Sequence, residues 1–259
     1  MDYAAFIPTL HCPACERKDT LHLAEVCLDV ENKVTAIAVC DHCLSLVNAS
    51  SLHSATSNEE ANHKEQTGAL ADLYKIPDEA ETIYENIEKN AFIADLALKY
   101  CPDPLTSSVV DIGYGRGYGL LKLSEVFEKA YGVEFFHDSL NALCTAIGRP
   151  DNLVQADAID ALDAPVDIVI MWHFLEHLQH TVSFLKEVRR KTKPGGHVLC
   201  QTPLYRKESI FSAHYTFFNH NSLRLVFEES GFDVVDVAFD YENSFITIIS
   251  TPAAEQRPD

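Results

Sequence analysis

A glycine-rich segment that follows Asp111 has the residue types and spacing of a cofactor site. An apolar run leads into the alternating glycines Gly113, Gly115 and Gly117, and an amphipathic stretch begins at Tyr118. Because glycine lacks a Cβ, it adopts left-handed backbone angles and lets a ligand approach the main chain, while the first turn of a helix offers unpaired N–H groups. A dinucleotide fingerprint starting at Gly113 would need glycine at position 118, and a phosphate-binding P-loop would need Gly-Lys followed by Ser or Thr. The segment therefore predicts a nucleoside cofactor held by a different glycine pattern.

Four of the eight cysteines have the spacing of a metal site. They form two Cys-x-x-Cys pairs, Cys12 with Cys15 and Cys40 with Cys43. Two strand-like runs between the pairs predict a hairpin. A hairpin bracketed by two such pairs matches a zinc ribbon, in which four thiolates fill a tetrahedral shell and the metal supplies folding energy. We therefore expect a structural Zn²⁺ with no open position for catalysis; incidental reduced dithiols are the alternative.

Polar residues also mark the ends of later strands in the predicted sheet. Glu134 ends the second strand, Asp157 and Ala158 follow the third, Trp172 ends the fourth and His173 follows it. In a doubly wound sheet, ligands bind at the carboxyl ends of the strands, and a carboxylate there can accept hydrogen bonds from both ribose hydroxyls. These positions are therefore expected to complete the cofactor site. The alternatives are an ordinary exposed glutamate at position 134 and a helix N-cap at Asp157.

The acidic residue and alternate glycines of the Asp111 loop resemble the cofactor motif of class I S-adenosylmethionine-dependent methyltransferases. The segment Leu175–His177 resembles that of the small-molecule methyltransferases that include the ubiquinone-pathway enzymes. The resemblance implies that the Asp111 loop holds the methionine portion of S-adenosylmethionine and that Glu134 holds the ribose. It also implies that Asp157 lies near the adenine amino group, with the N–H of Ala158 toward the ring.

Histidines near the fourth and fifth strands are the candidates for a general base. Methyl transfer from a sulfonium depends largely on in-line positioning, and an oxygen or carbon acceptor also benefits from a base. His173, His177 and His214 have side chains that titrate in the useful range. In one alternative, Glu176 and His177 only order their loop. In another, His173, His177 and His180 bind a metal, which requires this loop to be helical.

Two features of the chain bear on the acceptor. The segment after the fourth strand lacks the Asn/Asp-Pro-Pro-Tyr arrangement with which amino-group methyltransferases hold a planar nitrogen. This absence favours an oxygen or carbon acceptor. Tyr205, Arg206 and His214 follow the fifth strand and are expected to line the acceptor side.

Alternating strand and helix patterns predict an α/β fold, with a Rossmann-like parallel sheet and helices on both faces. Expected strands lie at residues 108–112, 130–134, 152–155, 166–172, 197–201, 232–239 and 244–250, and expected helices at 118–128, 138–146, 181–191 and 222–230. The last two strands are joined by a short polar stretch, so they should form an antiparallel hairpin. The family resemblance, which covers residues 79–250, likewise implies a seven-stranded sheet that closes in this way. The Lys-Pro-Gly-Gly segment at 193–196 is expected to end a helix and turn the chain.

The chain divides by pattern into a small part and a large part. Residues 1–50 hold the expected zinc ribbon, and residues 77–259 hold the methyltransferase domain. The polar residues 51–76 between them are expected to form a linker, either solvated or loosely helical. Apolar residues at helical spacing over 77–100 predict one or two helices before the first strand.

Composition restricts location and partners. The formal charge of −19 disfavours a nucleic-acid partner, because such binding depends on Lys and Arg contacts. No apolar stretch approaches the ~20 residues of a membrane span, and the N-terminus lacks the order of a signal peptide, so a cytoplasmic location is expected.

The expected function is transfer of a methyl group from S-adenosylmethionine to an oxygen or carbon of a small-molecule or carrier-bound acceptor. The zinc ribbon is expected to dock to a substrate carrier, to another protein partner or to a second subunit. An RNA methyltransferase that uses the ribbon to hold RNA is one alternative, and a catalytically inactive cofactor-binding scaffold is the other.

Overall fold

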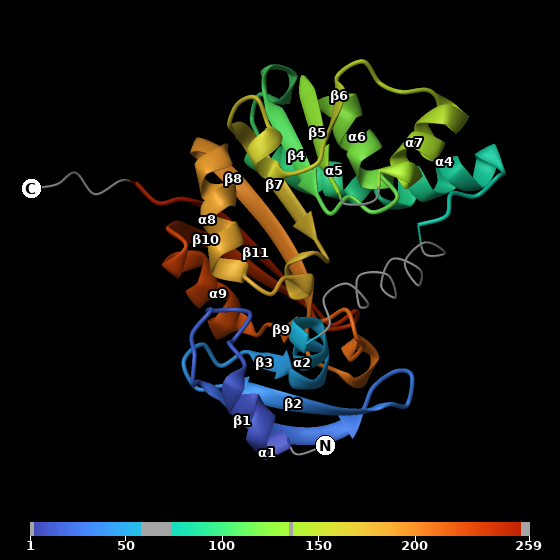
Figure 1. The fold of residues 1–259 in the computed structure, drawn as a ribbon. Coiled ribbons are helices and arrows are strands. Elements are labelled where there is room, and N and C mark those ends of the chain that lie inside the picture. The colour runs from blue at the N-terminus through green and yellow to red at the C-terminus, as the bar shows by residue number, and fades with distance from the viewer. Residues whose placement is uncertain (1–2, 58–73, 135–136, 255–259) are drawn as a thin grey trace, which may run out of the picture. The chain divides into compact units, whose positions relative to one another are not determined.

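The structure comprises two compact units that alternate along the chain. The computed structural model describes residues 3–57, 74–134 and 137–254 (Figure 1). One unit combines Met1–Gly68, His173–Lys186 and Cys200–Ile249, and the other combines Ala69–Trp172, Glu187–Leu199 and Ser250–Asp259. Residues far apart in the sequence therefore share a unit, and the domain boundaries expected at residues 50 and 76 stay a prediction.

The first unit contains a four-stranded sheet with the order β1-β2-β3-β9. Its strands are β1 (Leu21–Leu28), β2 (Val34–Cys40), β3 (Leu46–Asn48) and β9 (Thr216–Phe217). β1 and β2 form the expected hairpin, and the Asp29 carboxylate holds its turn by accepting hydrogen bonds from the N–H groups of Glu31 and Lys33. β9 pairs antiparallel with β3, so the sheet gains a strand from far along the chain that the sequence did not predict.

The first unit also contains short helices. They are α1 (Tyr3–Phe6), η1 (Ile7–Thr9), α2 (Ala49–Ser57), η4 (Leu175–His177), η5 (Lys207–Ser209) and α9 (His220–Glu229). Helix α2 occupies the start of the expected linker, and its Leu52 and Ala55 side chains are buried. The stretch 58–73 of that linker lies outside the described residues.

A seven-stranded sheet has the order β10-β11-β8-β7-β4-β5-β6. Its strands are β4 (Ser108–Ile112), β5 (Lys129–Val133), β6 (Leu153–Ala156), β7 (Val166–Trp172), β8 (Thr192–Pro203), β10 (Phe232–Asp240) and β11 (Phe245–Pro252). β4 pairs in parallel with β5 and β7, and β5 pairs in parallel with β6. Residues 241–244 join the neighbours β10 and β11, and this connection is too short for a parallel crossover. The predicted seven-stranded sheet with an antiparallel closing hairpin is therefore confirmed.

Helices precede and connect these strands. They are α4 (Ala80–Lys89), α5 (Ala91–Tyr100), η2 (Pro104–Thr106), α6 (Tyr118–Val126), α7 (Asp138–Ile147), η3 (Ile159–Ala161) and α8 (Thr181–Lys191). The predicted helices are confirmed, with ends that shift by up to two residues, and α4 and α5 are the pair expected before the first strand. Within the described ranges, no helix has the length and apolar character that crossing a membrane requires.

The Lys-Pro-Gly-Gly segment at 193–196 lies inside the start of β8 and does not form a separate turn. Helix α8 ends at Lys191, and β8 begins with the next residue. Gly195 has a φ of 79°, which shows where the backbone departs from regular extended geometry. Lys193 Nζ lies 2.7 Å from the Asp167 carboxylate, so this end of β8 is fastened to β7 by an ion pair.

Candidate functional site

The glycine loop after β4 has the backbone that its sequence predicts. Gly113, Gly115 and Gly117 have φ values of 74°, 57° and 85°, which are left-handed angles that favour glycine. Gly117 is the N-cap of α6, which begins at Tyr118. The loop therefore presents main-chain atoms and a helix N-terminus at the carboxyl end of β4, where ligands of such sheets bind.

Two acidic side chains approach this loop from neighbouring strands. Asp111 lies in β4, is only 3% exposed and pairs with Gly132 of β5. Glu134 follows β5, and its Oε2 accepts a hydrogen bond from the N–H of Gly115 at 3.2 Å. Burial and, secondarily, the charge of Glu134 raise the pKa of Asp111 to about 7. Because an opposite charge nearby favours the ionised carboxylates, this pair suits a positively charged ligand.

Tyr74 lies against the glycine loop. A Cβ built on Gly115 would lie 3.4 Å from Cε1 of Tyr74. Burial and, secondarily, the charge of Glu134 raise the pKa of Tyr74 to about 12, so its hydroxyl stays protonated at neutral pH. Tyr74 falls at the end of the polar stretch that was expected to be a linker, and no motif there could have identified it.

A chain of polar contacts runs from the loop to Asp157. The Tyr114 hydroxyl accepts a hydrogen bond from Gln155 Nε2 at 3.0 Å and lies 3.3 Å from His137 Nδ1. The other ring nitrogen of His137, Nε2, lies 2.8 Å from Oδ1 of Asp157. The place of Tyr114 between the loop glycines could have identified it, whereas His137 and Gln155 have no comparable signal in the sequence.

The remaining predicted cofactor residues lie in less enclosed places. The Asp157 side chain is 94% exposed, and Ala158 is also exposed. Among the described residues, η3 has Ala158 as its N-cap and no side-chain cap bond, so Asp157 is not the N-cap that the alternative required. Trp172 is half-buried, with its ring centroid 5.6 Å from that of Phe92. The cofactor roles of Asp157, Ala158 and Trp172 stay predictions.

A side chain at Gly132 is expected to disturb the packing behind the loop. A Cβ at this position would lie 2.8 Å from Cδ1 of Tyr114 and closer still to Leu120. We expect Gly132→Ala to lower the free energy of unfolding by ~1–3 kcal/mol, because extra volume in a packed core forces side chains off their rotamers. Chemical denaturation measures the change. Adding Leu120→Ala removes the nearest clash, so the double variant should lose less stability than the two single variants together; strict additivity would contradict the steric explanation.

The three histidines predicted as general bases surround Glu176 in the first unit. Glu176 lies in η4 with a side-chain exposure of 0%, and its Oε1 lies 3.6 Å from His173 Nδ1, 4.0 Å from His177 Nε2 and 3.7 Å from His214 Nε2. His180, in the same loop, is exposed and is not part of the group. The structure therefore brings His214, which comes after β8 in the sequence, next to Glu176, which comes before it. The alternative that grouped His180 with His173 and His177 is wrong.

Electrostatics and backbone contacts hold this group in place. Burial alone would raise the pKa of Glu176, but the neighbouring His173, His177 and His214 side chains outweigh it and lower that pKa. Burial and, secondarily, the charge of His177 lower the pKa of His214 to about 4. The Glu176 carbonyl accepts a hydrogen bond from the N–H of Tyr215 at 2.9 Å. At neutral pH the group thus contains an ionised carboxylate beside a neutral, buried imidazole.

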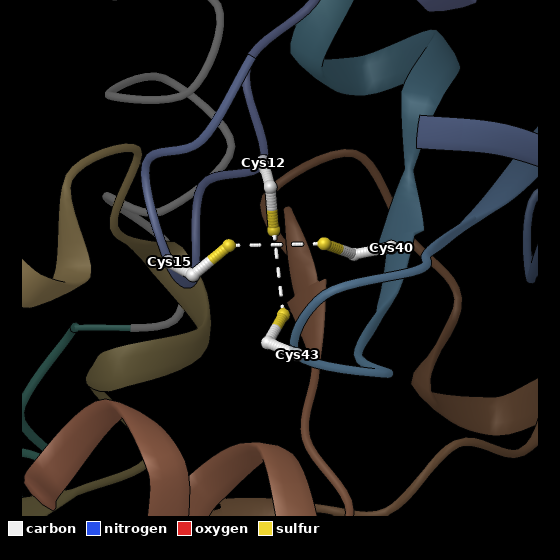
Figure 2. A group of neighbouring side chains, drawn as sticks. All are labelled: Cys12, Cys15, Cys40 and Cys43. Carbon is white, nitrogen blue, oxygen red and sulfur yellow. Dashed lines mark hydrogen bonds between the residues drawn. The ribbon is translucent and has the colours of Figure 1, made fainter. Parts of the chain in front are cut away.

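The four predicted zinc ligands converge in the first unit. Figure 2 shows the side chains of Cys12, Cys15, Cys40 and Cys43 pointing toward a common centre. Cys12 Sγ lies 3.7 Å from Cys43 Sγ, Cys15 Sγ lies 3.7 Å from Cys40 Sγ, and all four sulfurs lie within 4.8 Å of one another. Zinc–sulfur bonds of about 2.3 Å place the sulfurs of a tetrahedral site about 3.8 Å apart. The donor set and its spacing therefore fit a structural zinc ion.

Hydroxyl groups surround the sulfurs. Ser45 Oγ lies 3.0 Å from Cys43 Sγ, and Thr20 Oγ1 lies 3.2 Å from Cys40 Sγ. Hydrogen bonding with Cys12 lowers the pKa of Cys43 to about 7, with a smaller contribution from Cys15. Such outer contacts orient thiolate ligands and favour their deprotonated form.

The first cysteine pair also caps helix α8. The carbonyl of Pro13 accepts a hydrogen bond from the N–H of Thr181 at 3.0 Å, and the Glu16 carboxylate accepts from the N–H and the hydroxyl of Ser183, both at 2.6 Å. Thr181 and Ser183 are the first and third residues of α8, whose N–H groups have no acceptor inside the helix. A carboxylate is also favourable beside the positive end of the helix dipole. The ribbon and α8 therefore stabilise each other.

Tyr205 and Arg206 are engaged within the first unit. The Tyr205 hydroxyl donates a hydrogen bond to the Glu25 carboxylate on β1. The Arg206 guanidinium donates to the Ser244 hydroxyl and, at 3.1 Å, to the Glu208 carboxylate. Tyr205 and the hairpin line an open depression of about 400 Å³. The acceptor-side role of these residues stays a prediction.

Comparison with known proteins agrees with this geometry. Residues 84–237, more than half of the chain, match the family described as the methyltransferase domain. A relative from Mycolicibacterium smegmatis, named "Probable S-adenosylmethionine-dependent methyltransferase", is 28% identical over 138 residues, which cover 49% of this chain and 52% of the relative. The ubiquinone/menaquinone biosynthesis C-methyltransferase of Burkholderia cenocepacia is 33% identical over 103 residues, which cover 35% of this chain and 41% of that protein. The chain thus spans about half the length, or less, of these curated relatives.

A solved structure shares the fold of the chain. The 1,6-didemethyltoxoflavin-N1-methyltransferase of Burkholderia thailandensis superposes with a TM-score of 0.59 and 16% identity, covering 89% of this chain and 100% of that one. The glycine loop, its two carboxylates, the seven-stranded sheet and the family match lead to one conclusion. The chain belongs to the methyltransferase-domain family, within the class I S-adenosylmethionine-dependent methyltransferases.

Proposed function

We propose that this protein transfers a methyl group from S-adenosylmethionine to an oxygen or carbon atom of a small-molecule or carrier-bound acceptor. The observation that carries the proposal is the meeting of Asp111, the left-handed glycine loop and Glu134 at the carboxyl ends of the adjacent strands β4 and β5. Asp111 would attract the ammonium of the methionine portion, and Glu134 would accept hydrogen bonds from the ribose hydroxyls. S-adenosylmethionine, when bound, supplies an electrophilic methyl group on a sulfonium.

The protein's own contribution would be positioning and proton removal. In such a transfer, an electron pair of the acceptor atom would form the bond to the methyl carbon while the carbon–sulfur bond breaks and its electrons pass to sulfur. Holding the acceptor in line with that bond supplies much of the rate. The acceptor proton would pass to His173, His177 or His214, which lie together beside Glu176. Exposure supports His173 or His177, whose side chains are 36% and 35% exposed, over His214 at 8%.

The acceptor class is supported by composition and by motif. The formal charge of −19 opposes the approach of a phosphate backbone, which is why RNA is the weaker candidate and a small molecule the stronger one. The segment after β7 also lacks the Asn/Asp-Pro-Pro-Tyr arrangement that holds planar nitrogens.

The ribbon would bind zinc and dock a partner. Cysteine is the ligand type of structural zinc sites, and the four sulfurs have the spacing of a tetrahedral shell. The hairpin also exposes large apolar side chains, namely those of Leu23, Val26, Leu28, Val30 and Val34. A group of exposed apolar residues is a common feature of protein interaction sites, so the hairpin is our candidate for contact with a protein or a protein-bound acceptor.

A methyl-transfer assay tests the proposed function. The full-length protein is incubated with S-adenosylmethionine labelled in the methyl group and with either a cell extract of small molecules or purified RNA. We expect label to enter the small-molecule fraction. The Asp111→Ala variant, which lacks the carboxylate proposed to hold the cofactor ammonium, should transfer none. Label that enters only RNA, in a reaction weakened by salt, would contradict this proposal and support an RNA methyltransferase. Tight S-adenosylmethionine binding without transfer to either fraction would indicate a scaffold.

A further inference from the structure

We propose that Glu176, His177 and His214 bind a divalent transition-metal cation, with His173 at the edge of the site. This site lies within the first unit and uses none of the four cysteines. It goes beyond the proposed methyl transfer, because it is a statement about metal binding that holds whatever the acceptor is.

The first observation is a buried carboxylate that lacks hydrogen-bond partners. Both oxygens of Glu176 are buried, and within the described part of the chain neither accepts a hydrogen bond. Ring nitrogens of His173, His177 and His214 lie 3.6 to 4.0 Å from Oε1, which is beyond hydrogen-bond distance. An ionised carboxylate buried without compensation costs several kcal/mol. A cation between the carboxylate and the rings would supply this compensation.

The second observation fixes the direction in which two of the rings present their lone pairs. His177 Nδ1 lies 2.8 Å from the carbonyl of Ala213, and His214 Nδ1 lies 2.8 Å from the carbonyl of Ser209. A carbonyl oxygen only accepts, so each Nδ1 carries a hydrogen, and Nε2 is the ring nitrogen left to bind a metal. Both Nε2 atoms face Oε1 of Glu176. Two ring nitrogens and a carboxylate oxygen gathered in this way form a ligand set for a cation.

The same hydrogen bonds are those expected of metal-bound histidine. A histidine that ligates a metal through one ring nitrogen usually donates the other N–H to a backbone carbonyl or carboxylate, which fixes the tautomer and the ring orientation. His177 and His214 both make this contact from outside the group. The ring of Phe211 lies 3.9 Å from the ring of His214, centroid to centroid, and adds a packing contact that orients it.

The spacing of the ligand atoms leaves room for one ion. The ligand atoms of Glu176, His177 and His214 all lie within 4.8 Å of one another. Metal–nitrogen bonds of about 2.0–2.1 Å place the ligands of a tetrahedral site about 3.4 Å apart. The observed separations of 3.7 and 4.0 Å exceed this by a few tenths of an ångström, which small ring rotations can close. Imidazole and carboxylate ligands suit zinc, iron, manganese or nickel.

The site is closed on one side and open on the other. Glu176 and His214 have side-chain exposures of 0% and 8%, whereas His173 and His177 are about one-third exposed. His173 has a φ of 54°, a left-handed angle that is costly for a residue with a Cβ and that clusters at functional sites. Three protein ligands with an open position are typical of a catalytic metal. On the basis of the proposed function, an acceptor hydroxyl bound there would lose its proton more easily; the metal site itself does not depend on that function.

Metal counting on the full-length protein tests this proposal. The purified protein is stripped with a chelator, reloaded with Co²⁺ and desalted, and bound cobalt is measured by elemental mass spectrometry and by visible absorption. We expect Glu176→Gln to bind one equivalent less than the original protein while keeping the sulfur-to-cobalt charge-transfer band of the ribbon. The matched control, His180→Gln, alters an exposed histidine of the same loop and should leave the cobalt content unchanged.

The result that would overturn the proposal is equal cobalt content in the original protein and in Glu176→Gln. That outcome would mean that protons, and not a metal, compensate the buried carboxylate. Should Glu176→Gln fail to fold, as judged by circular dichroism and thermal unfolding, His177→Gln decides the matter, because it removes a partly exposed ligand and leaves the buried carboxylate in place. His177→Gln with full cobalt content would likewise contradict the site.

Discussion

Replacing Glu134 with alanine is expected to weaken the binding of S-adenosylhomocysteine by about 10- to 100-fold. The carboxylate follows β5 beside the glycine loop, and its Oε2 is held by the N–H of Gly115 at 3.2 Å. A hydrogen bond to a charged group contributes about 1.5–3 kcal/mol, and about 1.4 kcal/mol corresponds to tenfold in affinity. Isothermal titration calorimetry measures the change.

The matched control for this prediction is Glu125→Ala. Glu125 lies in the same unit, on an exposed face of α6, so its removal should leave the affinity for S-adenosylhomocysteine unchanged. Equal weakening in both variants would indicate a general loss of negative charge. No weakening in Glu134→Ala would remove this carboxylate from the cofactor site.

The same site should make S-adenosylmethionine binding depend on pH. Burial raises the pKa of Asp111 from about 3.8 to about 7. Between these two pH values, the folded, cofactor-free protein therefore carries a proton on Asp111 that the unfolded chain has lost. This group therefore contributes stability that is fully present below about pH 4 and is lost as the pH rises through 7, a change of at most about 4 kcal/mol. The positively charged cofactor favours the ionised carboxylate, so its affinity should fall as the pH drops below 7. Calorimetry between pH 5.5 and 8 should show this fall, and the Asp111→Asn variant should lack it.

Replacing Cys40 with serine is expected to release the metal of the ribbon and to unfold the β1–β2 hairpin. Structural zinc contributes about 10–16 kcal/mol in zinc-finger peptides, so the loss of one of four ligands should lower the stability of this region by several kcal/mol. Hydrogen exchange should show faster exchange of the amides of β1 and β2. Because the Cys12–Cys15 pair caps α8, the amides of Thr181 and Ser183 should also exchange faster.

Cys27→Ser is the control for the ribbon prediction. Cys27 lies on β1 of the same hairpin but outside the group of four sulfurs. Its replacement should leave the metal content and the protection of the hairpin amides unchanged. A Cys40→Ser variant that kept the full metal content would show that this cysteine is not a ligand.

Local patterns made much of this fold predictable. The left-handed angles of Gly113 and Gly117 and the start of α6 follow from residue types that lie within a few positions of one another. The hairpin of the ribbon is equally local, because its turn residues lie between two strand-like runs. In these elements, residues that interact are also close in sequence, so the local sequence pattern is enough to predict the structure.

Other contacts could not be read from the sequence because they join distant segments without a periodic pattern. The pairing of Leu46 with Phe217 extends the ribbon sheet with a strand of only two residues. His214 reaches Glu176 through a loop that has no regular repeat, so the sequence could name both residues but could not place them together. Tyr74 lies against the glycine loop from a polar stretch that resembles any linker.

The capping of α8 by the first cysteine pair has a consequence for evolution and for protein engineering. The N–H groups of Thr181 and Ser183 donate to acceptors of Pro13 and Glu16. These acceptors are correctly placed only while the loop that holds the first cysteine pair keeps its conformation. A ribbon of this kind therefore cannot be removed or exchanged between proteins as an independent module. Truncation before residue 50, or exchange for the ribbon of another protein, would leave the start of α8 unsatisfied unless a new cap evolved beside it. Position 16 and the first turn of α8 should accordingly show correlated substitutions among related proteins.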